Sequence, residues 1–122
     1  MNSLGKLAEM SACEYLQKKK YHLVDVNYTS RFGEIDLIMS KGKYICFIEV
    51  KMRSENSIAS PMEFVDAAKQ QKIIATAEMY LASHSCDLQP RFDVVEVYYK
   101  NNRMKSVSYT HLRAHETGRN LV

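Results

Sequence analysis

The apolar positions of this chain follow two periods, one typical of helices and one typical of strands. Between Leu4 and Leu16 they recur every three or four residues, which predicts an amphipathic helix. Ser3 is a good N-cap for this helix, and the lysines at 18–20 suit the negative end of its dipole. From His22 to Tyr28 apolar and polar residues alternate, so we expect a strand with one exposed face. The side chains on its other face are Val24, Val26 and Tyr28.

Two apolar, β-type runs lie between Gly33 and Arg53, joined by a short polar stretch, and predict a hairpin. An even-numbered loop centred on residues 41–42 would place Asp36 opposite Phe47 and diagonal to Glu49, on one face of the sheet. The two carboxylates would then lie within reach of one cation. An odd-numbered loop without a bulge would place them on opposite faces.

The rest of the chain continues the alternation of helices and strands. We expect a polar loop over Ser54–Ala59, a helix from Pro61 to about Ser83, and strands over Phe92–Tyr99 and Met104–Ser108, the last at a sheet edge. The helix start is well marked, because Ser60 and Glu63 form a capping box around a proline at the first helical position. The pattern predicts an α/β protein.

Residues 109–122 show neither period and resemble translated adaptor read-through, so we set them apart from an expected domain over residues 1–108. His111 and His115 have a spacing that could bind a metal on a helix, but no third ligand follows nearby.

Composition adds that this is an ordinary globular domain. The 122 residues include 46% hydrophobic and 25% charged residues, and the net charge of +3 suits a nucleic-acid partner without requiring one. Three isolated cysteines suggest reduced thiols and a cytoplasmic location. With no run of 18 apolar residues and no export-type N-terminus, we expect no membrane association.

Charged residues inside the hairpin runs need an explanation, since a buried charge is costly unless it is paired or bound to a metal. Asp36 and Glu49 offer hard oxygen ligands of the kind that Mg²⁺ or Mn²⁺ prefers. Lys51, two residues after Glu49 on the same strand face, could hold an attacking water or stabilise a phosphate. This arrangement favours phosphodiester hydrolysis. A surface ion pair between Glu49 and Lys51 explains the triplet equally well from these residues alone.

Helical positions near this hairpin are also candidates. Glu9 falls at the rim of the apolar stripe of the first helix, where it is either a surface residue or a side chain directed into the site. Lys69 and Gln70 lie on apolar lines of the second helix. Snorkelling explains Lys69 as well as function does, and Gln70 is the more suggestive of the two.

Several motifs together resemble one family. They are Gly5 with Glu9, the run Arg31-Phe32-Gly33-Glu34-Ile35-Asp36-Leu37-Ile38, the run Phe47-Ile48-Glu49-Val50-Lys51 with Arg53, then Pro61, Lys69-Gln70 and Arg91-Phe92-Asp93-Val94-Val95. Over about residues 4–107 the chain resembles the bacterial YraN-like family. That family is placed in the PD-(D/E)xK, or restriction-endonuclease-like, nuclease superfamily, akin to archaeal Holliday junction resolvases.

The resemblance implies an αβββαβ core, with a mixed sheet of four to five strands flanked by two helices. It also implies a Mg²⁺ or Mn²⁺ site formed by Asp36, Glu49 and the backbone carbonyl of Val50. Lys51 would be the catalytic lysine, Glu9 a helper that binds a second metal or a water, and Gln70 a further contact of the site.

We therefore expect a metal-dependent DNA endonuclease, with branched or damaged DNA as a candidate substrate. The expected phosphate contacts are Arg31, Lys41, Lys43, Arg53, Lys69 and Arg91. A symmetric homodimer is expected by analogy with enzymes that cut two strands. One rival is a non-catalytic module that binds nucleic acid or protein, and a more remote one is an interaction protein whose Tyr98-Tyr99 edge recruits a strand.

Overall fold

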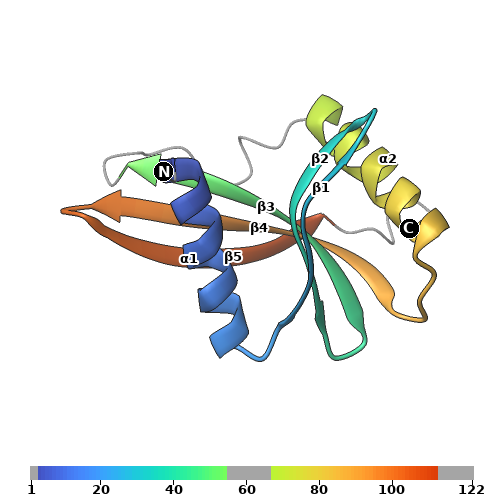
Figure 1. Cartoon of the computed structure of the whole chain (residues 1–122), viewed down its shortest axis with the longest axis horizontal. Coiled ribbons are helices and arrows are strands. Elements are labelled where there is room, and N and C mark those ends of the chain that lie inside the picture. Colours follow the sequence, from blue (N-terminus) through green and yellow to red (C-terminus); the bar gives the residue numbers. More distant parts are fainter. Residues whose placement is uncertain (1–2, 55–66, 113–122) are drawn as a thin grey trace.

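Five strands form one mixed sheet, with the two helices on its opposite faces (Figure 1). The structure, a computed structural model, describes residues 3–54 and 67–112. Its elements are α1 (Leu4–Lys18), β1 (His22–Ser30), β2 (Gly33–Lys41), β3 (Tyr44–Ser54), α2 (Ala67–Ser83), β4 (Gln89–Lys100) and β5 (Arg103–Leu112). The strands lie in the order β1-β2-β3-β4-β5, all antiparallel except the β3–β4 pair. The predicted α/β class and αβββαβ core are confirmed, with a fifth strand at the edge, and the fold is consistent with a restriction-endonuclease-like core.

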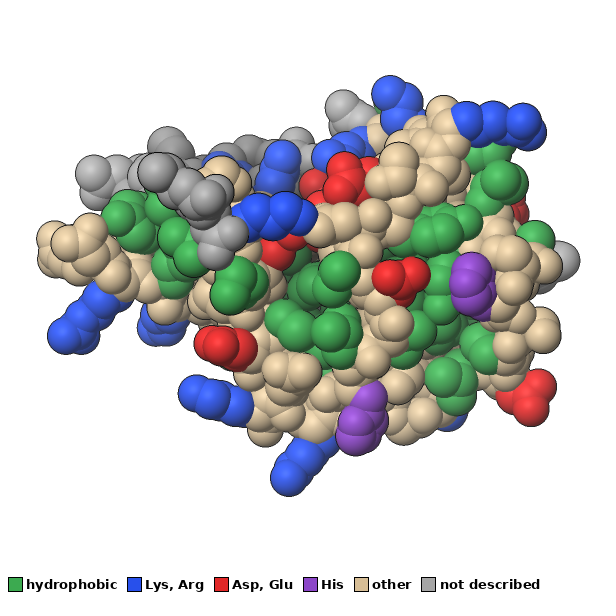
Figure 2. Space-filling view, viewed as in Figure 1, with side chains coloured by type: hydrophobic (Ala, Val, Ile, Leu, Met, Phe, Trp, Pro, Cys, Tyr) green, Lys and Arg blue, Asp and Glu red, His purple; other side chains and the backbone are tan. Residues whose placement is uncertain are grey.

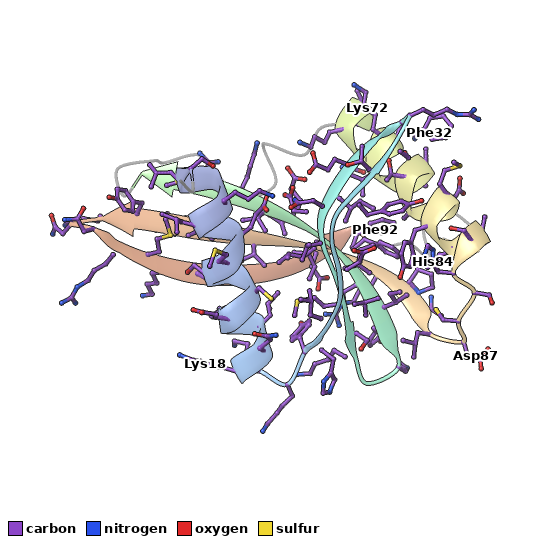
Figure 3. All side chains as sticks on the ribbon, in the orientation of Figure 1. Lys18, Phe32, Lys72, His84, Asp87 and Phe92 are labelled. Carbon is purple, nitrogen blue, oxygen red and sulfur yellow. The ribbon has the colours of Figure 1, made fainter. Side chains whose placement is uncertain are left out.

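Side-chain alternation in the central strands builds a core on each face of the sheet. On β3, Phe47 packs towards α2 with Ile73 and Tyr80, and Phe92 of β4 lies in the same cluster (Figure 3). Cys46 and its neighbours on the other face pack against α1, whose buried residues are Ala8, Ala12 and Leu16. The parallel β3–β4 pair is covered on both faces, as parallel pairs usually are.

The first helix begins as expected. Ser3 is its N-cap, and the Ser3 hydroxyl accepts a hydrogen bond from the backbone N–H of Lys6 at 3.2 Å. The apolar stripe of this helix is only partly buried, however, because Leu4 and Leu7 are exposed. No helix among the described residues has the length and apolar character needed to cross a membrane.

The expected burial pattern of the first strand is wrong. Val24 and Val26 are 44% and 48% exposed. The pairing of β1 with β2 shifts register between Leu23 and Asp25, and Asn27 has a φ of 49°. Such an irregularity breaks the two-residue period, so the apolar positions no longer share a buried face.

The predicted hairpin forms, but in a different register. Lys41 pairs with Tyr44 across the two-residue turn 42–43, and Ile38 rather than Asp36 lies opposite Phe47. The loop has an even number of residues as required, although its centre is shifted by one residue from the predicted position.

Other boundaries differ at the ends of elements. The loop predicted over 54–59 falls, apart from Ser54, outside the described residues, and so does the capping box at 60–63. The last strand ends at Leu112, four residues later than predicted, and so includes the first residues of the segment that we set apart.

Tyr98 and Tyr99 do not form a sheet edge, because β4 is paired with β3 on one side and β5 on the other. The proposed strand-recruiting edge is therefore wrong.

Candidate functional site

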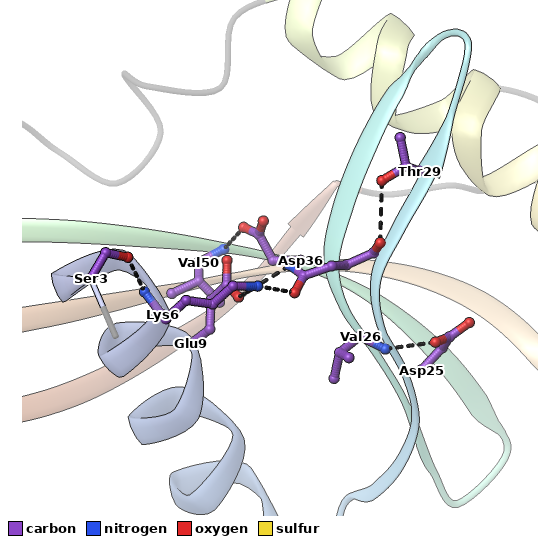
Figure 4. Close-up of polar contacts among 9 residues, drawn as sticks. Ser3, Lys6, Glu9, Asp25, Val26, Thr29, Asp36 and Val50 are labelled. Atoms are coloured by element: carbon purple, nitrogen blue, oxygen red, sulfur yellow. Dashed lines mark hydrogen bonds and ion pairs between the residues drawn. The ribbon is translucent and has the colours of Figure 1, made fainter. Parts of the chain in front are cut away.

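The candidate site lies where β2 separates from β3. The pairing of these strands ends at Leu37 and Ile48, so the next step along the ladder would place Asp36 at the level of Glu49. Instead of continuing the backbone ladder, the Asp36 carboxylate accepts a hydrogen bond from the Val50 N–H at 2.8 Å (Figure 4). The Asp36 side chain thus accepts a hydrogen bond from a backbone N–H of β3 that lies beyond the end of the β2–β3 pairing.

A cavity of about 260 Å³ opens beside this point, between the sheet and α2. Both Asp36 and Glu49 line it, as the expected same-face arrangement requires. From α2 come Lys69, which forms a 2.9 Å ion pair with Glu49, and Lys72. The cavity therefore contains carboxylates from two strands and ammonium groups from a helix, a combination that can bind a cation or an anionic phosphate.

The electrostatics of Asp36 reflect competing effects. Burial raises the pKa of its carboxyl, the Val50 hydrogen bond lowers it, and the charges of Glu49, Glu9 and Glu34 raise it further. The result is a pKa of about 7 instead of the ordinary 3.8. Acidic side chains are therefore gathered closely enough to repel one another, and a bound cation would relieve that repulsion.

Glu9 reaches this region from the other face. Its carboxylate accepts a hydrogen bond from the side-chain amide of Asn27 at 3.1 Å and lies 3.5 Å from the Lys6 ammonium (Figure 4). It is directed towards β1 rather than into bulk solvent, and its charge acts on Asp36. It lines a separate hollow between α1 and β1, however, so the acidic residues do not surround one common cavity.

Comparison with known proteins identifies the family. The family model described as "Uncharacterised protein family UPF0102" matches residues 8–97. The chain belongs to the UPF0102 family. It is 39% identical to the UPF0102 protein of Caldanaerobacter subterraneus over 90% of this chain and 91% of the relative. It is 38% identical to that of Flavobacterium psychrophilum, with 85% and 87% covered, and 44% identical to that of Alkaliphilus metalliredigens, with 78% and 84% covered.

In this UPF0102 chain the third member of the predicted site, Lys51, is half-buried on β3. Alternation places it on the face of Glu49, and its register partner on β4 is Glu96. Glu96 is fully buried, accepts a hydrogen bond from Tyr98 at 2.9 Å, and forms a 3.3 Å ion pair with Arg53. We did not predict Glu96, although an acid inside the apolar run from Phe92 is the same signal that singled out Glu49.

Two further charged residues of the cavity, one acid and one base, were not predicted as site residues from the sequence. Glu34 and Lys72 line it, and neither stands out in the sequence because each looks like an ordinary surface charge. Gln70 is half-buried but does not line this cavity, whereas Lys69 does. The α2 residue with the clearer place in the site is thus the lysine and not the glutamine.

The donor set suits a hard divalent cation better than zinc. Within residues 3–54 and 67–112, no three His, Cys, Asp or Glu side chains converge as a preformed metal cluster. Mg²⁺ does not need one, since it usually binds one or two carboxylates together with water and substrate phosphates. Asp36 and Glu49 fit this description.

The expected phosphate contacts of this UPF0102 chain do not form one surface. Lys69 lines the cavity and pairs with Glu49, whereas Arg53 lies further along β3 and pairs with Glu96. Arg91 forms a 2.8 Å ion pair with Asp93 and lies over the ring of Tyr44. The remaining candidates are at two turns: Arg31 lies in the β1–β2 turn, and at the β2–β3 turn Lys41 ends β2 and Lys43 lies within the turn.

Proposed function

We propose that this protein is a metal-dependent nuclease that hydrolyses phosphodiester bonds in DNA of the bacterial cytoplasm, with branched or damaged DNA as its substrate. The observation that carries the proposal is the cavity shared by the Asp36 and Glu49 carboxylates. Two carboxylates from neighbouring strands, with a lysine two residues after the second, form the donor set of a Mg²⁺- or Mn²⁺-dependent phosphodiesterase. The resemblance of these motifs to PD-(D/E)xK nucleases supports the same assignment.

Asp36, Glu49 and the Val50 carbonyl would hold the metal. The Val50 N–H points to Asp36, and in a strand the C=O of a residue points to the same edge as its N–H. The carbonyl therefore faces the side where β2 has separated. A bound Mg²⁺ or Mn²⁺ supplies charge neutralisation at the phosphate and makes a water more acidic.

The other residues of the site act on the substrate. The Lys51 ammonium, on the face of Glu49, stabilises negative charge on the phosphate oxygens or holds the attacking water. Glu9 contributes negative charge near Asp36 from the α1 side, which suits a role in binding a second cation or a water. Lys69 and Lys72 supply positive charge at the cavity for the DNA backbone.

One observation favours a second candidate function. The Lys69 ammonium already lies 2.9 Å from Glu49, so an internal cation neutralises one of the two carboxylates. In a non-catalytic nucleic-acid-binding module this ion pair would be permanent and the acidic residues structural. That module binds DNA without a divalent metal and does not cleave it.

The test is cleavage of linear and branched DNA in Mg²⁺ or Mn²⁺, with calorimetric titration of each metal. We expect Asp36→Asn and Lys51→Ala to lower the cleavage rate by about 100-fold or more, since each removes a group that stabilises transition-state charge. Asp36→Asn should also remove the heat of metal binding. Asparagine keeps the side-chain oxygen that the Val50 N–H requires, so the fold should persist.

Asp25→Asn is the matched control. The Asp25 carboxylate accepts a hydrogen bond from the Val26 N–H at 2.8 Å, just as Asp36 does from Val50, but it does not line the cavity (Figure 4). Its variant should cleave at the wild-type rate. Equal cleavage by the wild type and the three variants, Asp36→Asn, Lys51→Ala and Asp25→Asn, would identify a contaminating nuclease and refute the proposal. DNA binding that is unchanged by Asp36→Asn, without cleavage or metal heat, would favour the binding module.

A further inference from the structure

An apolar surface lies on α1 and β1, on the side that Figure 2 presents. Among the described residues, eight large hydrophobic side chains are exposed, and six of them belong to these two elements. The six are Leu4, Leu7, Met10, Leu23, Val24 and Val26. Three of the six, Met10, Leu23 and Val26, line one groove. Figure 2 shows hydrophobic side chains gathered between α1 and β1, with charged side chains at the border. A groove with exposed apolar side chains on both of its sides is typical of a protein interface.

The surface is hollowed rather than flat. A groove of about 370 Å³ lies between α1 and β1, with Met10 and Cys13 on one side, Leu23 and Val26 on the other, and Leu37 at its base. β1 is the first strand in the sheet order, so within the described part of the chain it has a strand neighbour on one side only. A helix or strand laid along this groove would bury the apolar side chains of both elements.

The charges along α1 indicate which partner fits. Lys6, Met10 and Glu14 follow one another at intervals of four residues, so they form a single line along the helix. All three are exposed, the Lys6 side chain and Met10 by 53% and 52%. The line therefore has a basic end, an apolar centre and an acidic end.

Such a line is complementary to a reversed copy of itself. If two α1 helices cross antiparallel at Met10, position 6 of one faces position 14 of the other, because both positions lie four residues from Met10 in opposite directions. Lys6 then meets Glu14 of the second copy at both ends, Met10 meets Met10, and the opposed helix dipoles also attract. A partner with an unrelated charge pattern would not gain both ion pairs.

We propose that the α1–β1 surface binds a second copy of this chain, with the two α1 helices antiparallel about a twofold axis near Met10. Lys6 already contacts Glu9 and Asn27 within its own chain, but its exposed ammonium has donors left for a glutamate of the second copy. The apolar groove supplies the driving force, and the two ion pairs determine the direction of the helices. The proposal does not depend on nuclease activity.

Sedimentation equilibrium over a wide range of protein concentration tests it. The wild type should reach twice the chain mass of 14.1 kDa. Met10→Glu should abolish the dimer, because two carboxylates would meet at the axis without a counter-charge. Glu14→Lys should weaken it by about tenfold or more, since lysines would then face each other at both ends. The double variant Lys6→Glu, Glu14→Lys should restore wild-type affinity, because it exchanges the two ends of the line.

Glu78→Lys is the matched control, an exposed glutamate on α2, and should leave the dimer unchanged. Circular dichroism should show every variant folded, as expected for exposed positions. A wild type that is monomeric at all concentrations would overturn the proposal and leave the surface to a different partner. A dimer insensitive to both Met10→Glu and Glu14→Lys would place the contact elsewhere, and a double variant as weak as Glu14→Lys would refute the antiparallel arrangement.

Discussion

At the scale of single residues, Asp36 combines a structural and an electrostatic task. It satisfies the Val50 N–H where β2 leaves β3, and this hydrogen bond favours the ionised carboxylate. Burial and the charges of Glu49, Glu9 and Glu34 act in the opposite direction and prevail, which gives the pKa of about 7. Near neutral pH the folded chain therefore holds a proton here that the unfolded chain has released.

This proton predicts a pH dependence of stability in the absence of divalent metal. An acid whose pKa is raised by folding stabilises the folded state while protonated, and that stability is lost as pH rises from about 4 to about 7. The difference between 3.8 and about 7 corresponds to a loss on the order of 4 kcal/mol in the free energy of unfolding. Urea denaturation in a chelating buffer should show this loss in the wild type.

The Asp36→Asn variant should lack this part of the pH dependence, because its amide does not titrate, whereas Asp25→Asn should keep it. A parallel loss of stability with pH in the wild type and in Asp36→Asn would contradict the assignment of the proton to Asp36.

At the scale of elements, β3 organises the candidate site because both of its neighbours contribute to it. On the β2 side Asp36 meets Val50, and on the β4 side Lys51 is in register with Glu96. The fully buried Glu96 is held by Arg53 and Tyr98, so the polar region on this face of the sheet continues past the cavity. A buried carboxylate is stable only while such partners remain.

The pairing between β3 and β4 predicts an asymmetric double-mutant cycle. Arg53→Met should lower the free energy of unfolding by about 3 kcal/mol, because it deprives the buried Glu96 of its countercharge. Adding Glu96→Gln should recover most of that loss, since a neutral amide of the same shape no longer needs a cation and can still accept from Tyr98. Thermal and urea denaturation of the four proteins measure the cycle. Additive losses would mean that the two side chains do not interact.

At the scale of the whole molecule, a second group of basic side chains lies apart from Lys69 and Lys72 of the acidic cavity. Lys41 and Lys43 lie at the β2–β3 turn, and the Lys41 ammonium contacts the carbonyl of Lys19 at the end of α1. The labelled Lys18 lies at this end of the molecule, while Lys72 on α2 lies at the opposite end (Figure 3). Under the proposed function, a bound DNA backbone would therefore have a basic contact region apart from the acidic cavity.

This separation predicts how DNA binding should respond to salt. Replacing Lys41 and Lys43 with alanine should weaken binding to all sequences alike. It should also reduce the slope of log K against log salt by about 1.8, since each phosphate contact contributes about 0.9. Fluorescence anisotropy with a labelled duplex at several salt concentrations gives both quantities. Lys105→Ala, an exposed lysine on β5, is the control and should leave the slope unchanged. An unchanged slope in the double variant would remove the β2–β3 turn from the DNA interface.

The sequence by itself determined the order of the elements, the N-cap at Ser3, and the sharing of one sheet face by Asp36 and Glu49. These follow from local rules, because helical and strand periods, caps and an even-numbered turn involve residues close together in the chain. The motifs also indicated the family.

Only the tertiary structure decided the remaining features. It set the register of the hairpin, the exposure of Val24, the place of β4 inside the sheet rather than at its edge, and the partners of Glu49 and Glu96. Each depends on contacts between segments far apart in sequence, where a one-residue shift or a bulge reverses which side chains are buried. The apolar surface of α1 illustrates the difference: its period predicts a helix, but only the packed sheet decides which of its apolar residues remain exposed.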